Sequence, residues 1–274
     1  MVPAHHRSLG AGLITALAIA FLVLPVAIIV LFSFQDSGSL AFPLDKLSFR
    51  WYRAVFTASD VGDALRFSIT VAAIVAGLTL VFGTLAAYGA VRAPRRLQPV
   101  LTLLFFLPIA LPGLFVGVGL LIWFLHIGLP LGMGSVVIAH VVYAFPFFFL
   151  IARVALERLD PALEEAAATL GAGPLCRFRR VTLPQVVPLL VAAAALAFML
   201  SIDEFIITNL VVGDRPTLPI LISTRLRRTV DPQLNVISTL LITASVLAWM
   251  VAFVAIARRD RQRARRLRLL DGTT

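Results

Sequence analysis

The stretch LQPVLTLLFFLPIALPGLFVGVGLLIWFLHIGLPLGMGSVVIAHVVYAFPFFFLIA, residues 97–152, contains no Asp, Glu, Lys or Arg. A helix needs roughly 20 apolar residues to cross a bilayer, so this stretch is long enough for about two crossings. Gly128, Pro130 and Gly132 supply turn-forming residues near its middle. The stretch therefore predicts two membrane-spanning helices joined by a short turn.

Other uncharged stretches before and after this one are also long enough to cross a bilayer. The chain as a whole is 60% hydrophobic and 14% charged, a composition that excludes an ordinary soluble domain. We therefore predict an all-α membrane protein with six transmembrane helices. The predicted spans are residues 9–34, 66–91, 98–125, 134–153, 186–210 and 233–257.

The distribution of basic residues predicts which side of the membrane each segment occupies. With the N-terminal segment 1–8 inside, most of the 24 lysines and arginines fall on the cytoplasmic side, as the positive-inside rule requires. Residues 9–257 would form the transmembrane domain, with a cytoplasmic loop at 155–184 and a basic cytoplasmic tail at 258–274. Both termini would then be cytoplasmic. The net charge of +10 indicates contact with anionic lipid headgroups rather than with nucleic acid.

Motifs for catalysis are missing from the sequence. No Gly-Lys-Ser/Thr phosphate-binding loop, HExxH zinc motif or G-x-S-x-G nucleophile motif occurs. The histidines do not have the spacing of that zinc motif, and we expect His126 and His140 to be packed or interfacial residues. The sequence therefore predicts a non-enzymatic chain with no catalytic residue, no metal site and no cofactor of its own.

The polar segment EEAAATLGAGPLCRFRRVTLP, Glu164 to Pro184, interrupts this apolar chain. Asp160 and Pro161 form a helix start, because Asp caps free amides and Pro fits the first helical position. Gly171 is the matching stop, since glycine readily adopts the left-handed conformation that ends helices. The pattern predicts a short amphipathic helix whose acidic pair lies away from an apolar stripe. The stripe consists of Leu163, Ala166, Ala167 and Leu170.

Two interpretations of this loop are open from the residues alone. It lies on the membrane surface with its arginines at the headgroups, or it docks onto another protein. The loop resembles the coupling loop of permease subunits of binding-protein-dependent ABC importers, whose short helix sits in a cleft of the ATPase subunit. The resemblance implies that Glu164, Leu170 and Phe178 also belong to an ATPase-coupling surface. The residues that match the motif are Glu165, Ala166, Ala167, Gly171, Leu183 and Pro184.

The similarity extends along most of the chain. The segments LFSFQDSGS, LSFRWYRAVF, SIDEFIITNLVVG and DPQLNVISTLL resemble the second permease subunit of spermidine/putrescine importers. This resemblance implies a type I ABC importer permease fold in a bacterial inner membrane. It also implies an ATPase dimer that carries Mg-ATP, a second and different permease subunit, and an extracytoplasmic solute-binding protein as partners. The solute would be polyamine-like, or else an opine, a phosphonate, an amino acid or another small solute.

The third predicted span contains Pro108 and Pro112, which free backbone carbonyls that hydrocarbon cannot satisfy. Such breaks occur where backbone lines a cavity, and also where neighbouring helices relieve a kink. The polyamine permeases tend to have an acidic residue after this proline, whereas this chain has Gly113. The departure leaves the charge of the solute open.

Asp203 and Glu204 are the unusual acids at the end of the fifth predicted span. Helix geometry places them near the outer end of the hydrocarbon core, where at most one of two adjacent side chains faces a central cavity. They could instead be solvated or pair with Arg225, Arg227 or Arg228. The resemblance favours a substrate pathway. Its candidate residues are Trp51, Pro112, Ser201, Asp203 and Glu204.

An ion-driven secondary carrier is the rival interpretation of a chain with broken helices. Carriers of this class place acids or histidines deep in the membrane and often contain inverted repeats. The sequence shows no inverted repeat of its uncharged stretches and gives no sign of a deep acid or histidine relay. We therefore expect ATP-driven import.

Overall fold

The described part of the chain is helical apart from turns, short connections and one isolated backbone bridge between Gln35 and Leu47. The predicted end segments 1–8 and 258–274 lie outside it. The computed structural model describes residues 9–37, 46–228, 232–243, 246–247 and 250. It divides into two compact units, Met1–Ala58 with Arg225–Thr274, and Ser59–Thr224.

The first unit contains one apolar helix and a small aromatic cluster. Helix α1 (Leu9–Phe32) is apolar on all sides, and its span is not buried within this chain. Helix α2 (Arg50–Thr57) follows it. Phe34 and Tyr52 stack with ring centroids 5.2 Å apart, and the Tyr52 hydroxyl shares a 2.8 Å hydrogen bond with Ser33 Oγ. These contacts hold α2 against the segment that follows α1.

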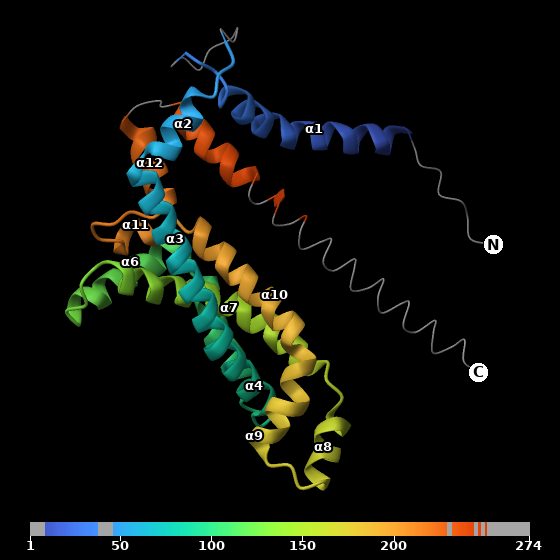
Figure 1. Cartoon of the computed structure of the whole chain (residues 1–274). Helices are drawn as coiled ribbons and strands as arrows, with labels where there is room; N and C mark the ends of the chain where they lie inside the picture. The colour runs from blue at the N-terminus through green and yellow to red at the C-terminus, as the bar shows by residue number, and fades with distance from the viewer. Residues whose placement is uncertain (1–8, 38–45, 229–231, 244–245, 248–249, 251–274) are drawn as a thin grey trace. The chain divides into compact units, whose positions relative to one another are not determined.

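Within the second unit, three long helical rods lie side by side: α3 with α4, α7, and α10 (Figure 1). Two π-helical turns, Thr79–Gly83 and Phe178–Thr182, join α3 to α4 and α9 to α10 without ending the rods. The helix bounds are α3 Ser59–Leu78, α4 Thr84–Arg92, α5 Gln98–Ala110, α6 Gly113–His126, α7 Met133–Glu157, α8 Pro161–Thr169, α9 Pro174–Arg177, α10 Leu183–Asp203, α11 Thr208–Val211 and α12 Leu218–Arg228.

The all-α membrane architecture predicted from the sequence is confirmed. Within the described residues, four helices are long and apolar enough to cross a membrane, or up to five crossings if α5 and α6 form one broken span. The predicted sixth span, 233–257, extends beyond the described residues, which include a shorter apolar helix at Gln233–Thr243. The four helices are Gly12–Phe32, Ser59–Arg92, Met133–Glu157 and Pro174–Asp203.

The break in the predicted third span lies at Pro112, where α5 and α6 meet with a bend of 100°. Leu111 has extended backbone angles (φ −97°, ψ 134°), because a residue before proline is disfavoured in the helical region. Pro108, in contrast, lies inside α5 without ending it. The turn predicted at Gly128 and Gly132 joins α6 to α7.

Two of the predicted spans have boundaries that differ clearly from those of the helices. The helix predicted at 186–210 ends at Asp203, because Glu204 leaves the helical region (φ −68°, ψ 121°), and its rod already begins at Pro174. The rod predicted to begin at 66 begins at Ser59. Counting uncharged residues finds only the part of a helix that hydrocarbon surrounds, so it misses polar turns that continue the same helix.

Helix α7 forms the centre of the second unit's core. Half of its apolar span is buried, including Phe148 and Phe149. The ring of Phe105 on α5 packs on Phe149 with centroids 4.9 Å apart, and Leu190 of α10 belongs to the same cluster. Lipid tails are as apolar as these side chains, so close van der Waals packing is what holds the helices together.

Small residues allow α6 to approach α11 closely. A Cβ atom at Gly117 would lie 2.8 Å from Cδ1 of Leu210 and 3.2 Å from the backbone Cα of Ile207. Gly119, two residues later on the same helix, faces open space. The close contact between α6 and α11 is therefore made at Gly117.

Replacing Gly117 with valine should destabilise the protein by about 1–3 kcal/mol, because the new side chain overlaps α11. The measurement is the thermal unfolding midpoint of the purified chain in detergent. Gly119→Val adds the same side chain to the same helix and should stay within about 0.5 kcal/mol of the natural protein. Equal midpoints for the two variants would contradict the close contact.

Candidate functional site

The loop helix α8 begins and ends as its sequence predicts. The Asp160 side chain accepts a hydrogen bond from the Ala162 amide at 2.9 Å, and Pro161 occupies the first helical position. At the other end Gly171 has φ +83°, and the Ala172 amide donates to the Ala167 carbonyl at 3.0 Å. This pairing closes the helix as a Schellman motif, in which glycine takes the left-handed position.

Apolar side chains of this loop are exposed. Leu170 is 88% exposed and Leu163 48% exposed, and Leu175 of α9 is 68% exposed. The loop lies at one end of the second unit, where the rods end (Figure 1). Apolar surface gathered on a polar loop indicates a contact with another molecule.

Glu164 departs from the prediction, because it faces the rods instead of sharing an outer face with Glu165. Its side chain is buried, and Oε1 accepts hydrogen bonds from Arg92 Nη2 and Thr182 Oγ1. Burial acts to raise the pKa of the Glu164 carboxyl, but the hydrogen bonds from Arg92 and Thr182 and the charges of Arg92 and Arg177 outweigh it and lower this pKa. Glu165 is exposed, as predicted.

The remaining loop residues predicted as coupling residues lie in different environments. Phe178 packs within the chain, with its ring centroid 4.7 Å from that of Tyr88 on α4. It therefore connects the loop to α4 and is not part of the exposed apolar surface. Leu183 packs against the core of α7 and α10. Ala166 and Pro184 are exposed.

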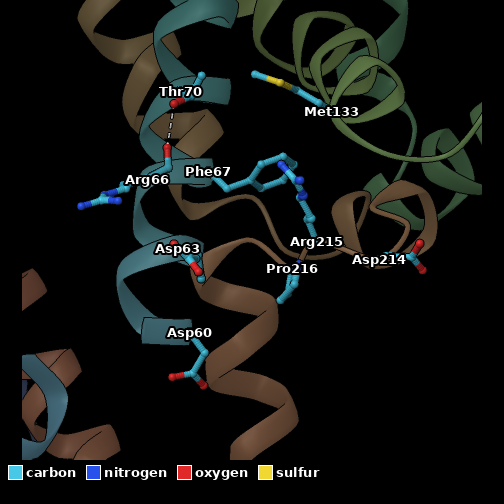
Figure 2. Close-up of a pocket in the computed structure, with 10 residues that line it drawn as sticks. Asp60, Asp63, Arg66, Phe67, Thr70, Met133, Asp214, Arg215 and Pro216 are labelled. Atoms are coloured by element: carbon cyan, nitrogen blue, oxygen red, sulfur yellow. Dashed lines mark hydrogen bonds between the residues drawn. The ribbon is translucent and has the colours of Figure 1, made fainter. Parts of the chain in front are cut away.

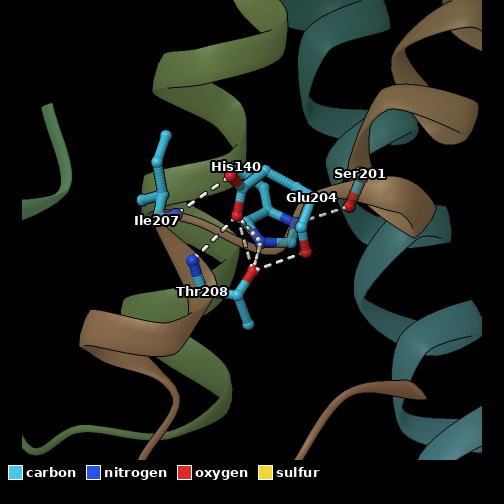
Figure 3. A network of polar contacts seen from close by, with 5 residues as sticks. All are labelled: His140, Ser201, Glu204, Ile207 and Thr208. Carbon is cyan, nitrogen blue, oxygen red and sulfur yellow. Dashed lines mark hydrogen bonds and ion pairs between the residues drawn. The ribbon is translucent and has the colours of Figure 1, made fainter. Parts of the chain in front are cut away.

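A polar cluster is buried at the opposite end of the same unit (Figure 3). His140 of α7 is fully buried, with Nδ1 2.7 Å from Ser201 Oγ and Nε2 2.7 Å from Thr208 Oγ1. The Glu204 carboxylate accepts from the amides of Ile207 at 2.9 Å and Thr208 at 2.8 Å, and from the Thr208 hydroxyl at 2.7 Å. Glu204 therefore satisfies the free amides at the start of α11.

The two ring nitrogens of His140 contact different helices. Nδ1 shares a hydrogen bond with Ser201 Oγ of α10, and Nε2 shares one with Thr208 Oγ1 of α11. The Thr208 hydroxyl is also 2.7 Å from Glu204 Oε2, so the side chains form one connected network. The cluster ties α7, α10 and α11 together where the rod of α10 ends.

The structure separates the residues predicted to line a substrate pathway. Asp203 is exposed at the end of α10, whereas Ser201 and Glu204 are buried in the polar cluster. Pro112 is exposed at the break before α6. Trp51 belongs to the first unit, where the Arg50 guanidinium lies 5.0 Å from its ring centroid.

The sequence showed no sign of a deep acid or histidine relay, and the structure places one acid, Glu204, in a buried position beside His140. Glu204 is buried because the chain turns after Asp203, and the turn directs the two adjacent acids to different sides. His140 is a packed residue, as expected, but its partners come from segments 61 and 68 residues away in the sequence. No local pattern signals such a pairing.

A pocket of about 620 Å³ lies near the start of α3 (Figure 2). It is lined by charged residues of α3 and of the connection between α11 and α12, together with Phe67 and Met133. The sequence did not single out this group, because its members are ordinary surface residues when taken one by one. The charged residues are Asp60, Asp63, Arg66, Asp214 and Arg215.

The chain is similar to known transport proteins over most of its length. Residues 79–266 match the family described as "Binding-protein-dependent transport system inner membrane component". The putrescine transport system permease protein PotI of Escherichia coli (strain K12) is 33% identical over 92% of both chains. The spermidine/putrescine transport system permease protein PotC of the same strain is 28% identical over 92% of this chain and 95% of that protein.

Two further comparisons concern the solute and the fold. A protein of Salmonella paratyphi A described as a putative 2-aminoethylphosphonate transport system permease protein, PhnV, is 32% identical over 71% of this chain and 74% of its own length. The crystal structure of a bacterial ABC transporter involved in import of the acidic polysaccharide alginate aligns with a TM-score of 0.71. It is 14% identical and covers 93% of this chain and 98% of that one. The latter similarity concerns the fold alone.

The buried cluster around His140 predicts a large loss of stability when the ring is removed. His140→Leu should destabilise the protein by at least about 2 kcal/mol, because buried partners on α10 and α11 lose their hydrogen bonds. Thermal unfolding in detergent measures the loss. His126→Leu, at the exposed end of α6, is the control and should leave the midpoint unchanged. An unaltered midpoint in His140→Leu would show that the cluster does not stabilise the fold.

The lowered pKa of Glu164 predicts a pH dependence for α8. An ionised Glu164 stabilises the packing of α8, so this contribution is complete above the ordinary value of 4.5 and is lost as the pH falls below it. Hydrogen exchange of α8 amides, corrected for intrinsic rates, should show this loss of protection. Glu164→Gln should remove the pH step, and the exposed Glu165→Gln should retain it. A step that persists in Glu164→Gln would assign it to another group.

Proposed function

Because the chain belongs to the family of binding-protein-dependent transport system inner membrane components, we propose that it forms one half of the membrane path of an ATP-driven importer. The observation that carries the proposal is the exposed apolar surface of the loop that contains α8. The other half of the path is a second, different permease subunit. The loop and both chain termini face the cytoplasm, where the basic residues collect.

The exposed leucines support docking of this loop onto an ATPase. Leu163 and Leu170 lie at the two ends of the α8 segment, Leu175 lies in the first turn of the rod that begins at Pro174, and all three are exposed within this chain. Burying each of these side chains against a partner protein contributes roughly 1.5–3 kcal/mol to the free energy of binding. A dimer of ATPase subunits supplies that surface and carries Mg-ATP. This chain contains no phosphate-binding loop motif of its own.

The solute we propose is a small polyamine-like molecule, which an extracytoplasmic binding protein delivers. The names of the relatives PotI and PotC support this choice. A phosphonate is the second candidate, because PhnV is also similar and because Gly113 replaces the acidic residue typical of polyamine permeases. Uptake of radiolabelled putrescine and of 2-aminoethylphosphonate, each with its binding protein, distinguishes the two.

We assign the substrate path to the end of the rods away from α8. Asp203 presents an exposed carboxylate there, while Ser201 and Glu204 lie in the buried cluster at the end of the same helix. Pro112, at the break between α5 and α6, leaves backbone groups available to line a path. Trp51, on α2 of the first unit, completes the proposed set.

Affinity purification of the tagged chain from native membranes in mild detergent tests the proposal. An ATPase, a second permease and a binding protein that stimulates ATP hydrolysis should co-purify. The rival function is an ion-driven carrier, which the buried His140 and Glu204 pair would suit. Solute uptake by this chain alone, driven by a proton gradient without ATPase, would establish the rival.

Two glycines of the loop provide a matched test of coupling. Gly171→Val should sharply reduce uptake and the yield of bound ATPase, because a β-branched residue at φ +83° forces the end of α8 to change. Gly173→Val adds the same side chain at φ −66°, also with no heavy atom close by, and should behave like the natural protein. Normal uptake in both variants would contradict a coupling role for the end of α8.

A further inference from the structure

One buried carboxylate connects the loop helix to two of the rods. Glu164 accepts hydrogen bonds from Arg92 and from Thr182. Arg92 is the last residue of the rod that begins at Ser59, and Thr182 lies in the rod that continues to Asp203. A single side chain of α8 therefore contacts the loop ends of two helices that are long enough to cross the membrane.

The rest of α8 is poorly attached to the rods. Of its nine residues, all of which the structure describes, Glu164 alone is buried, with 7% of its surface exposed. Ala167 is half-buried, and the remaining α8 side chains are exposed. A displacement of α8 therefore reaches the rods mainly through this carboxylate or through the ends of its own chain.

We infer that Glu164 is a positioning residue that transmits movement of α8 to both rods through Arg92 and Thr182. The inference rests on the proposed docking of α8 onto an ATPase. It adds to that function the internal link between the docking surface and the membrane path. Neither the family motif nor the sequence pattern assigns this role, because the motif begins at Glu165.

Each of the two rods that Glu164 contacts contains a π-helical turn. Thr79–Gly83 interrupts the regular helix two turns before Arg92, and Thr182 is itself the last residue of Phe178–Thr182. π-helical turns are points at which helices kink, and they occur frequently at functional sites. A pull applied at Arg92 or at Thr182 therefore acts next to a segment that bends more readily than a regular helix.

Aromatic contacts make the linked groups move as one cluster. The Arg92 guanidinium lies 5.1 Å from the ring centroid of Tyr88, and the Tyr88 ring packs on Phe178 at 4.7 Å. The two rods are thus tied to each other at the position where Glu164 contacts them. The charge of Glu164 adds strength, because losing Arg92, whose own side chain is 45% exposed, would leave the buried Glu164 carboxylate without its charged partner.

The complete complex reconstituted in proteoliposomes tests the link. The readout is the ratio of ATP hydrolysis with the co-purified binding protein to hydrolysis without it, since a signal from the outer face must return through the same connection. Glu164→Leu should lower this stimulation about tenfold, the order of effect expected when a charge-assisted hydrogen-bonded link is lost. The amount of bound ATPase and its basal rate should not change.

Further variants separate transmission from simple loss of stability. Thr182→Val and Arg92→Gln each remove one branch of the link and should reduce stimulation less than Glu164→Leu does. The double variant with Glu164→Gln and Arg92→Gln should lose less stimulation than the sum of the losses in the two single variants, because both groups act through one contact. The control is Glu157→Gln, which breaks the exposed pair of Arg153 Nε and Glu157 Oε1, 2.7 Å apart within α7, and should keep full stimulation.

Each outcome has one meaning. Failure of the natural chain to bind an ATPase would overturn the proposed function, and this inference with it. Bound ATPase with full stimulation in Glu164→Leu would overturn the inference alone. Loss of bound ATPase in both Glu164→Leu and Thr182→Val, with a lowered unfolding midpoint, would show that the contact only maintains the fold of the loop.

Discussion

Satisfaction of backbone hydrogen bonds in hydrocarbon is the constraint on which the rest of this structure depends. A bare amide or carbonyl costs several kcal/mol in lipid, so the chain is helical wherever lipid surrounds it. The two breaks that matter obey the same rule. At the end of α10, the carboxylate of Glu204 accepts the amides of Ile207 and Thr208. At the break between α5 and α6, Pro112 is the N-cap residue of the new helix, a position whose amide makes no hydrogen bond within the helix.

The helices do not hold together for the same reason that a soluble core does. Lipid is as apolar as the side chains that it surrounds, so close packing and a few buried polar contacts provide the specificity. The large aromatic side chains of α7 and the close approach of α6 to α11 at Gly117 provide the packing. The polar contacts lie at the two ends of the unit, around His140 and around Glu164.

These two polar clusters give the two ends of the unit different properties. The cluster around His140 joins three helices and is fully satisfied within the chain, so it fixes the geometry at the proposed solute end. The cluster around Glu164 joins a largely exposed helix to two rods, so it leaves an apolar surface available to a partner. A transporter needs both properties, a shaped path at one end and a point of attachment for a motor at the other.

The sequence by itself determined every feature that depends on neighbouring residues. Uncharged length identified the apolar helical character of the chain, Asp160 and Gly171 the limits of α8, and Pro112 the break before α6. Only the tertiary structure decided that Glu164 turns inward and that Glu204 is buried beside His140. The reason is physical: helix packing brings Arg92 to Glu164 across 72 residues of sequence and His140 to Glu204 across 64, and the burial of an acid depends on which helices pack around it.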